Sequence, residues 1–261
     1  MAELMVQVAF LPGELTRVAE QVCVVVDVIR ASSALVTMFQ KGCGQVLLAG
    51  EIAEMHRLIG RDESSLCCAE DWLGRPVSGV QISPSLVELE QLDLTGKRVL
   101  FKTTNGTGAA RFTWENGAPV VLVGSLRNAT AAMGRALTEA LRLGVGVAIV
   151  CAGREGNRSV ALDDVYCAGV LVDRLLERAC ALGVSVDLKD SAFLARRVSR
   201  SYADPLVAFR ESGSGKVMME IGNERDIELC AQVDVAGCAP VLASGGPLWD
   251  ILVLPEKTSW S

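Results

Sequence analysis

The chain has 261 residues, and half of them are hydrophobic, which is enough for a substantial core in one large domain or two small ones. The net charge of −6 argues against non-specific nucleic-acid binding, because such binding needs clustered Lys and Arg to displace counterions. No apolar run approaches the roughly 18 residues of a membrane span, and no basic stretch followed by an apolar core opens the sequence, so we expect a soluble, untargeted protein without membrane contact.

Along the first two thirds of the chain, apolar patterns typical of strands alternate with patterns typical of helices. The predicted strands are Met5–Phe10, Val22–Val26, Val46–Ala49, Arg98–Phe101, Val120–Val123 and Val145–Val150. The predicted helices are Ala31–Lys41, Ile52–Ile59, Thr107–Glu115, Asn128–Leu143 and a long one from about Leu162 to Leu182. This alternation favours an α/β fold with three α/β/α layers and a largely parallel or mixed central sheet.

After Gly183 the pattern becomes mostly helical. The expected helical segments there are Asp187–Arg200, Pro205–Glu211, Gly215–Glu220 and Asn223–Gln232, and the apolar stretch Pro240–Ala243 is a candidate for a returning strand. The stretch Ser212–Gly215 is too short to separate domains. We therefore expect a single domain over residues 1–261. An internal duplication stays open, although no sequence repeat is visible.

The nine residues from Val24 to Ser32 place a carboxylate, a guanidinium and a hydroxyl at the end of an apolar run. A run of β-branched residues of this length predicts a strand buried on both faces, where charges are tolerated only when they are paired, metal-bound or functional. Asp27 and Arg30 are therefore candidate catalytic residues, and Ser32 is a candidate anion-binding residue at a helix N-terminus. The alternative is a capping serine beside a structural salt bridge.

Polar loops follow three other predicted strands, and in open α/β sheets ligands bind where the strands end. The first loop carries Lys102, Thr103, Thr104, Asn105, Gly106 and Thr107, whose hydroxyls and backbone N–H groups could cradle a phosphate or a sulfonate. The second carries Ser125 and Asn128. In both loops a plain helix-capping role is the competing interpretation.

The third loop carries Arg154, Glu155 and Arg158, and the adjacent acids Asp163 and Asp164 then open the long helix. Acids in a first helical turn are also favoured by the helix dipole, so a capping role stays open for this pair.

Several chemistries are excluded by what the sequence lacks. The single histidine, His56, is expected on an exposed helix face, so Ser-His-Asp triads, phosphohistidine chemistry and His-rich metal sites are ruled out. The nine cysteines include no Cys-x-x-Cys pair, and several lie in apolar runs, which indicates reduced thiols in a cytoplasmic protein. Cys151 lacks the Cys-x5-Arg spacing of cysteine phosphatases, and no Walker A sequence occurs. Any metal must then have oxygen ligands, for which Mg²⁺ is the natural ion.

Several motifs together resemble the 2-phosphosulfolactate phosphatases of the ComB type. The matching stretches are Asp27–Ser32, Thr103–Thr107, Val123–Ser125 with Asn128 and Ala129, Cys151–Gly153 with Gly156, Asp163 and Asp164 with Cys167–Gly169, and Asp226 with Ile227, Cys230 and Asp234. They run in family order from about Val22 to Val241. The resemblance implies a three-layer α/β/α fold and a magnesium-dependent enzyme that converts 2-phospho-3-sulfolactate to 3-sulfolactate and phosphate, a step towards coenzyme M.

The sequence also departs from the family pattern. In the second quarter only Glu70, Ser83 and Pro84 survive clearly. The family's Asn-Gly-Thr-Arg ends here in Gly108, which removes an anion-binding arginine, and its Glu-Asp pair has become Asp163 and Asp164. Phosphatase chemistry with an altered choice of substrate is therefore an open alternative.

From the residue chemistry we assign candidate roles. The proposed Mg²⁺ ligands are Asp27, Asp163 and Asp164, with Glu155 as a further candidate ligand or as the general acid. Arg30 and the loop Thr103–Thr107 are expected to hold the phosphoryl oxygens, and Lys102, Arg154 or Arg158 a second acidic group. Asp27 is alternatively a nucleophile that forms an aspartyl phosphate.

Three functions compete at this stage: a phosphatase for 2-phospho-3-sulfolactate, a phosphatase for another small acidic phosphoester, and a non-catalytic anion-binding protein. The several carboxylates favour an enzyme, because a pure anion receptor gains nothing from acids beside its ligand. The expected partner is a small phosphoester substrate, and assembly into a homo-oligomer stays open.

Overall fold

A single mixed sheet organises the part of the chain that the computed structural model describes, namely residues 3–49, 52, 53, 55, 65–71, 74, 75, 77–244 and 250–253. Its strands are β1 (Leu4–Ala9), β2 (Gln21–Val26), β3 (Gln45–Leu48), β4 (Ser65–Ala69), β5 (Arg98–Lys102), β6 (Val120–Gly124), β7 (Gly146–Cys151), β8 (Val186–Leu188), β9 (Val241–Ser244) and β10 (Asp250–Val253). They lie in the order β4-β5-β3-β10-β9-β6-β2-β7-β1-β8. The pairings are parallel except those of β9 and β10, which are antiparallel.

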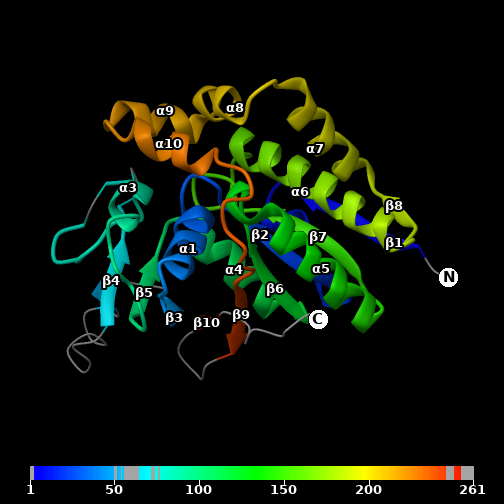
Figure 1. The fold of residues 1–261 in the computed structure, drawn as a ribbon, viewed down its shortest axis with the longest axis horizontal. Coiled ribbons are helices and arrows are strands. Elements are labelled where there is room, and N and C mark those ends of the chain that lie inside the picture. The colour runs from blue at the N-terminus through cyan, green and yellow to red at the C-terminus, as the bar shows by residue number, and fades with distance from the viewer. Residues whose placement is uncertain are drawn as a thin grey trace.

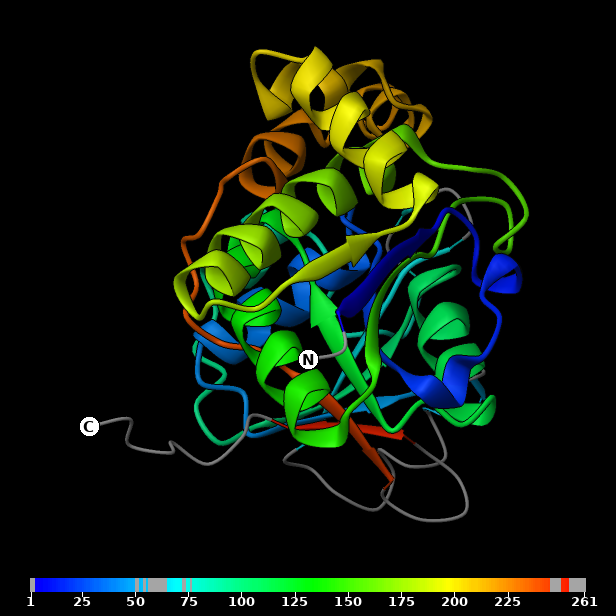
Figure 2. The same cartoon turned by 90° about the vertical axis from the view of Figure 1, so that its right-hand side faces the viewer.

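Helices cover both faces of the sheet (Figures 1 and 2). They are α1 (Ala31–Gln40), α3 (Leu86–Leu89), α4 (Gly106–Glu115), α5 (Ala129–Leu143), α6 (Leu162–Ala181), α7 (Asp190–Ser201), α8 (Pro205–Glu211), α9 (Gly213–Glu220) and α10 (Glu224–Cys230), with short 3₁₀ helices at Pro12–Glu14, Val18–Glu20 and Leu126–Asn128. In Figure 2, α5, α6 and α7 lie on one face and α4 on the other. The fold is therefore the expected three-layer α/β/α arrangement.

The centre of the sheet is β2, between β6 and β7, and all six of its residues are buried. Its run of valines suits this place, since β-branched side chains pack well on a surface covered on both sides. Helix α5 covers this region with an apolar stripe that includes Met133, Ala136, Leu137 and Ala140, at helical spacing. The helix ends at Gly144, whose φ of 68° is the left-handed conformation that glycine adopts without strain.

Helices α8, α9 and α10 lie across the end of the sheet where the parallel strands finish (Figures 1 and 2). Hydrogen bonds fix this placement: Ser214 at the start of α9 contacts Asp163 at the start of α6, and Asp226 in α10 contacts Arg30 before α1. The strand-end loops are thereby covered on one side, which creates a partly enclosed place for chemistry.

Most of the predicted elements are confirmed, including Pro240–Ala243, which returns as β9. The single helix predicted for Asp187–Arg200 is wrong in its first turn, because Val186–Leu188 pairs with β1 as an edge strand before α7 begins. Strands β4 and β10 were not predicted. Of the predicted helix Ile52–Ile59, the residues Ile52, Ala53 and Met55 are helical, while the rest, with His56, lies outside the described residues. No helix in the described ranges is long and apolar enough to span a membrane.

Candidate active site

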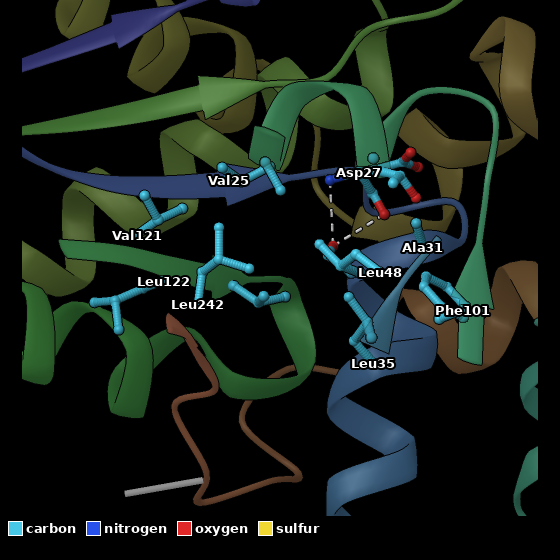
Figure 3. A pocket seen from close by; sticks show the side chains of 14 residues that line it. Val25, Asp27, Ala31, Leu35, Leu48, Phe101, Val121, Leu122 and Leu242 are labelled. Carbon is cyan, nitrogen blue, oxygen red and sulfur yellow. Dashed lines mark hydrogen bonds between the residues drawn. The ribbon is translucent and has the colours of Figure 1, made fainter. Parts of the chain in front are cut away.

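Asp27 lies at the centre of the site, directly after β2. Its carboxylate accepts backbone hydrogen bonds from Ala31 and Gly106, the first residues of α1 and α4. The Asp27 side chain therefore lies where two helices direct their free N–H groups, an environment that favours negative charge. The turn is held by Ser32, whose hydroxyl donates to the Asp27 carbonyl at 2.9 Å and accepts from the Asp27 N–H at 3.3 Å (Figure 3).

The adjacent acids that open α6 face the same strand ends. Asp164 is buried, and its carboxylate accepts hydrogen bonds from the N–H groups of Val28 and Gly153, each at 2.9 Å. Asp164 therefore ties the turn after β2 to the loop after β7. Asp163, also buried, accepts a hydrogen bond from the Ser214 hydroxyl at 3.2 Å, which connects it to the start of α9.

The three acids affect one another. Burial, with the nearby charges of Glu70 and Asp163, raises the pKa of Asp27 to about 7. Burial likewise raises the pKa of Asp163 to about 6, although hydrogen bonds and the nearby Arg154 guanidinium oppose the shift. The pKa of Asp164 is raised by burial and by both other aspartates. This Asp27 cluster, defined as Asp27, Asp163 and Asp164, therefore carries negative charge that the protein does not fully compensate.

The loop after β5 meets Asp27 at close range. A Cβ added at Gly106 would lie 2.8 Å from the Ala31 Cβ and 2.9 Å from the Asp27 Oδ2, so only glycine fits between α1 and α4. Gly106 does not adopt a positive φ, so the glycine is needed for close approach. From the sequence we expected the backbone of this loop to approach a bound phosphate or sulfonate. In the structure the group that lies against Gly106 is the Asp27 carboxylate. In the same loop Thr103 is buried, and its Oγ1 has no hydrogen-bond partner among the described residues.

A small cavity of about 20 Å³ adjoins the inner side of Asp27. Its lining is mostly apolar and includes Val25, Leu35, Phe101 and Leu242 (Figure 3). An apolar void of this size is dry unless polar groups hold a water in it. One side of the Asp27 carboxylate therefore faces a water-poor wall, which accounts for the large contribution of burial to its raised pKa.

Arg30 forms a second buried group beside the cluster. Its Nη1 donates to Asp226 at 2.6 Å, and its Nη2 donates to Glu70 at 2.8 Å and to the Gly74 carbonyl at 2.6 Å. Asp226 in turn accepts hydrogen bonds from the Ser85 hydroxyl and the Val87 N–H. We call Arg30, Glu70, Asp226 and Ser85 the Arg30 network. The two terminal nitrogens of Arg30 thus donate to protein groups, while its Nε is buried without a hydrogen-bond partner among the described residues, so the role of Arg30 in holding phosphoryl oxygens stays a prediction.

Three other predicted binding residues have their polar groups occupied. Ser125 and Asn128 are fully buried and form a capping box, in which the Ser125 N–H and hydroxyl both donate to the Asn128 Oδ1. The Asn128 amide nitrogen donates to the carbonyls of Val123 and Cys238. Capping therefore accounts for Ser125 and Asn128, and the Ser32 hydroxyl is used in the turn after β2.

The charged residues of the two outer loops differ in exposure. Glu155 and Arg158 are exposed, and Glu155 accepts a hydrogen bond from Ser159. The role of Glu155 as a metal ligand or general acid stays a prediction. Lys102, the last residue of β5, and Arg154, in the loop after β7, are half-buried, and neither side chain has a hydrogen-bond partner within the described ranges. These two cations are available for a ligand.

Asn105 connects these loops. Its Oδ1 accepts a hydrogen bond from the Gly156 N–H, and its carbonyl accepts one from the Asn157 side chain. Thr107 caps the same loop, because its Oγ1 accepts the Thr103 N–H, whereas Thr104 is exposed. Among the described residues, the side chains of Lys102, Thr103 and Thr104 and the amide nitrogen of Asn105 therefore keep polar groups without a partner.

Sequence reasoning missed Glu70, Asp226 and Ser214 as members of the site region. Glu70 and Asp226 were noted only as parts of family motifs, and their shared partner Arg30 connects segments far apart in the chain. Ser214 lies in a short Ser-Gly-Ser-Gly stretch without any catalytic signature. No signal in a single sequence indicates these contacts.

The donor set of the Asp27 cluster suits a hard divalent cation, because it consists of carboxylate oxygens with excess negative charge. Over the described part of the chain, however, no three His, Cys, Asp or Glu side chains already converge on one ion position. Asp27 and Asp164 each accept two backbone N–H groups, and every carboxylate oxygen keeps a further lone pair, so all three acids remain candidate ligands. Two carboxylates suffice for Mg²⁺, which usually keeps several waters and takes other ligands from substrate phosphates.

Comparison with known proteins gives one consistent answer. A family model described as 2-phosphosulpholactate phosphatase matches residues 10–245. A protein of Deinococcus radiodurans named "Probable 2-phosphosulfolactate phosphatase" is 34% identical over 224 residues, covering 86% of this chain and 88% of the relative. Proteins with the same name from Thermus thermophilus and Pseudothermotoga lettingae are 34% and 31% identical, and they cover 90% and 91% of this chain and 93% and 95% of their own lengths.

Proposed function

Because the chain belongs to the 2-phosphosulpholactate phosphatase family, a family of phosphoric monoester hydrolases, we propose that it hydrolyses 2-phospho-3-sulfolactate to 3-sulfolactate and phosphate. The observation that carries this proposal is the Asp27 carboxylate, held between the N-termini of α1 and α4 beside two further buried acids. Buried acids that repel one another are costly to a fold, and such groups concentrate at reactive sites. A non-catalytic anion-binding protein has no use for them.

We propose Mg²⁺ as the cofactor, held by Asp27 and Asp163. When bound, the ion supplies neutralising charge to the phosphoryl oxygens and lowers the pKa of a bound water. The raised pKa of Asp27, about 7, supports this assignment, because burial and the neighbouring acids Glu70 and Asp163 both disfavour its charged form and a divalent cation would stabilise that form.

The chain's own residues then bind and orient the substrate. The free Oγ1 of buried Thr103 and the ammonium of Lys102 suit the phosphoryl oxygens, because both are donors without a partner among the described residues. Asp164 does not act on the substrate directly. Its two backbone hydrogen bonds hold the loops after β2 and β7 in register, and it therefore positions Asp27.

Two roles remain for Asp27. As a nucleophile, its Oδ forms a bond to phosphorus while the bond from phosphorus to the substrate C2 oxygen breaks, and water then hydrolyses the aspartyl phosphate. As a metal ligand, it orients the ion and an attacking water. Acid quenching during turnover of a ³²P-labelled substrate distinguishes the two, because only the nucleophilic route leaves ³²P covalently bound to the protein as an alkali-labile acyl phosphate.

A related activity, the hydrolysis of another small acidic phosphoester, is supported by one observation at Gly108. A Cβ there would lie 2.6 Å from the Asn157 Oδ1, so Asn157 occupies the space beside this glycine. The resemblance described above implies an arginine at this position in the family. The binding surface for the acidic part of the substrate therefore differs here, and the preferred substrate can differ with it.

The test is phosphate release from a panel of 2-phosphoesters, including 2-phospho-3-sulfolactate, with and without Mg²⁺. We expect hydrolysis that disappears with EDTA, returns with Mg²⁺ and survives thiol alkylation, since burial raises the pKa of Cys151 well above its ordinary value and suppresses the reactive thiolate. Release from no member of the panel, in a folded protein supplied with Mg²⁺, would overturn the proposal. We also propose that the reaction occurs in the reducing cytoplasm and serves coenzyme M formation.

A further inference from the structure

Arg154 differs from the two buried arginines of the fold. The guanidinium groups of Arg30 and Arg127 donate to carboxylates, amides and carbonyls, and each of the two is almost completely buried. Arg154 is half-buried, and its guanidinium donates no hydrogen bond to any group in the described ranges. A guanidinium held at a site without a partner is suited to receiving an anionic group from a ligand.

Gly213, the first residue of α9, lies directly against this guanidinium. A Cβ built on Gly213 would lie 1.8 Å from the Arg154 Nη1 and 2.7 Å from its Cζ. The backbone of Gly213 is not in a left-handed conformation, so an L-residue is sterically compatible with its φ. The glycine at this position therefore serves the close approach of the Arg154 side chain.

The same two segments also hold the catalytic acids. Ser214, next to Gly213, donates to Asp163, and Gly153, next to Arg154, donates its N–H to Asp164. The Arg154 backbone is fixed further by its N–H bond to the Ser159 carbonyl at 2.7 Å. Arg154 is close enough to Asp163 to lower its pKa. When the phosphoryl group of a small substrate binds at the Asp27 cluster, the other groups of that substrate therefore lie near Arg154.

We propose that Arg154 selects substrates that carry a second acidic group, a sulfonate or a carboxylate, and that the bare backbone of Gly213 positions its guanidinium for this purpose. This inference rests on the proposed phosphatase function. It makes Arg154 a specificity residue and Gly213 a positioning residue, and it assigns α9 to the wall of the substrate site.

The decisive variants are Gly213→Ala and Arg154→Gln. In Gly213→Ala the new methyl group displaces the far end of a flexible side chain, which costs the fold little, while the charge of Arg154 is kept. Gly134→Ala is the matched control, because Gly134 also lies in a helix and a Cβ there meets no atom within 4 Å. KM and kcat are measured for 2-phospho-3-sulfolactate and for phenyl phosphate, which lacks a second acid.

For the acidic substrate we expect KM to rise about tenfold or more in both variants, since a charge-assisted hydrogen bond is lost or misplaced. We expect the KM for phenyl phosphate, and kcat for both substrates, to stay within about twofold of the values of the unaltered protein. General unfolding would instead lower the activity towards both substrates alike. In equilibrium binding, affinity for 3-sulfolactate falls while affinity for inorganic phosphate is kept. Adding Arg154→Gln to Gly213→Ala should have little further effect, because both changes remove the same contact.

Equal losses with both substrates, or no loss with either, would overturn the inference. If the unaltered protein hydrolyses neither ester, the proposed function fails, and the binding of 3-sulfolactate still tests Arg154 on its own. Unchanged 3-sulfolactate affinity in both variants then excludes Arg154 as the selecting residue.

Discussion

The Arg30 network and the Asp27 cluster lie at neighbouring strand ends, yet they treat buried charge in opposite ways. In the network, one guanidinium with a side chain only 1% exposed is paired with two carboxylates. In the cluster, acids face one another, and the pKa of Asp27 rises to about 7. Removing one partner of a buried ion pair leaves the other charge uncompensated and destabilises the fold, whereas a charge without a protein partner is available to a ligand. We therefore assign stability to the network and chemistry to the cluster.

The largest expected effect comes from Asp27→Asn. The change is nearly isosteric but removes the charge that a metal or a nucleophile requires, so we expect kcat to fall by a factor of roughly 10³ or more. Circular dichroism and thermal unfolding should show an intact fold. Turnover close to that of the unaltered protein would remove Asp27 from the mechanism and with it the division between cluster and network.

Breaking the network should have the opposite signature. Arg30→Met leaves Glu70 and Asp226 buried without their cation, so we expect the free energy of unfolding to fall by about 3–5 kcal/mol. Arg142→Met is the matched control, because its exposed pair with Glu139 is expected to contribute less than about 1 kcal/mol. The measurement is urea unfolding. If Arg30→Met keeps its stability but loses phosphate binding, Arg30 belongs to the active site after all.

The sequence was sufficient to predict the three layers and to select the three acids that the structure brings together as the Asp27 cluster. Strands such as Val22–Val26 are long apolar runs whose burial follows from composition, and Asp27 was identified because a charge at the end of such a run requires an explanation. Asp163 and Asp164 were likewise selected from their place in the first turn of a helix.

The partners of Arg30 were beyond the reach of the sequence, since Glu70 and Asp226 lie 40 and 196 residues away along the chain. Pairing across such separations depends on tertiary packing and leaves no local periodicity. The edge strand β8 was missed for a related reason: three residues are too few to show alternation, and their pairing with β1 is non-local. The exposure of Glu155 could not be predicted, because the burial of an acid in a loop depends on tertiary packing.

A subtler way to test the cluster is to disturb the support of Asp27 without touching its charge. Gly106→Ala places a methyl group 2.9 Å from the Asp27 Oδ2 and 2.8 Å from the Ala31 Cβ, so both must shift, and we expect kcat to fall about tenfold and the free energy of unfolding to fall as well. Gly134→Ala again provides the control, since it adds a methyl group to a helix in open space. Kinetics of phosphate release measure the effect, and an unchanged kcat would show that Asp27 tolerates displacement.

The smallest expected effect is on stability as a function of pH in the metal-free protein. The ordinary pKa of 3.8 rises to about 7 for Asp27 in the folded state, so the folded protein binds this proton more tightly than the unfolded chain does. The resulting stabilisation is complete below about pH 3.8, decreases as the pH rises and is lost above about pH 7. We expect the free energy of unfolding to fall by about 1–3 kcal/mol over this interval in EDTA, measured by urea unfolding.

Asp27→Asn should lose that part of the slope, because asparagine does not titrate. Mg²⁺ should offset the loss near pH 8 by binding the ionised carboxylates. Parallel pH profiles for the unaltered protein and Asp27→Asn would show that Asp27 is ionised throughout, and the contrast between the cluster and the network would then have to rest on Asp163 and Asp164.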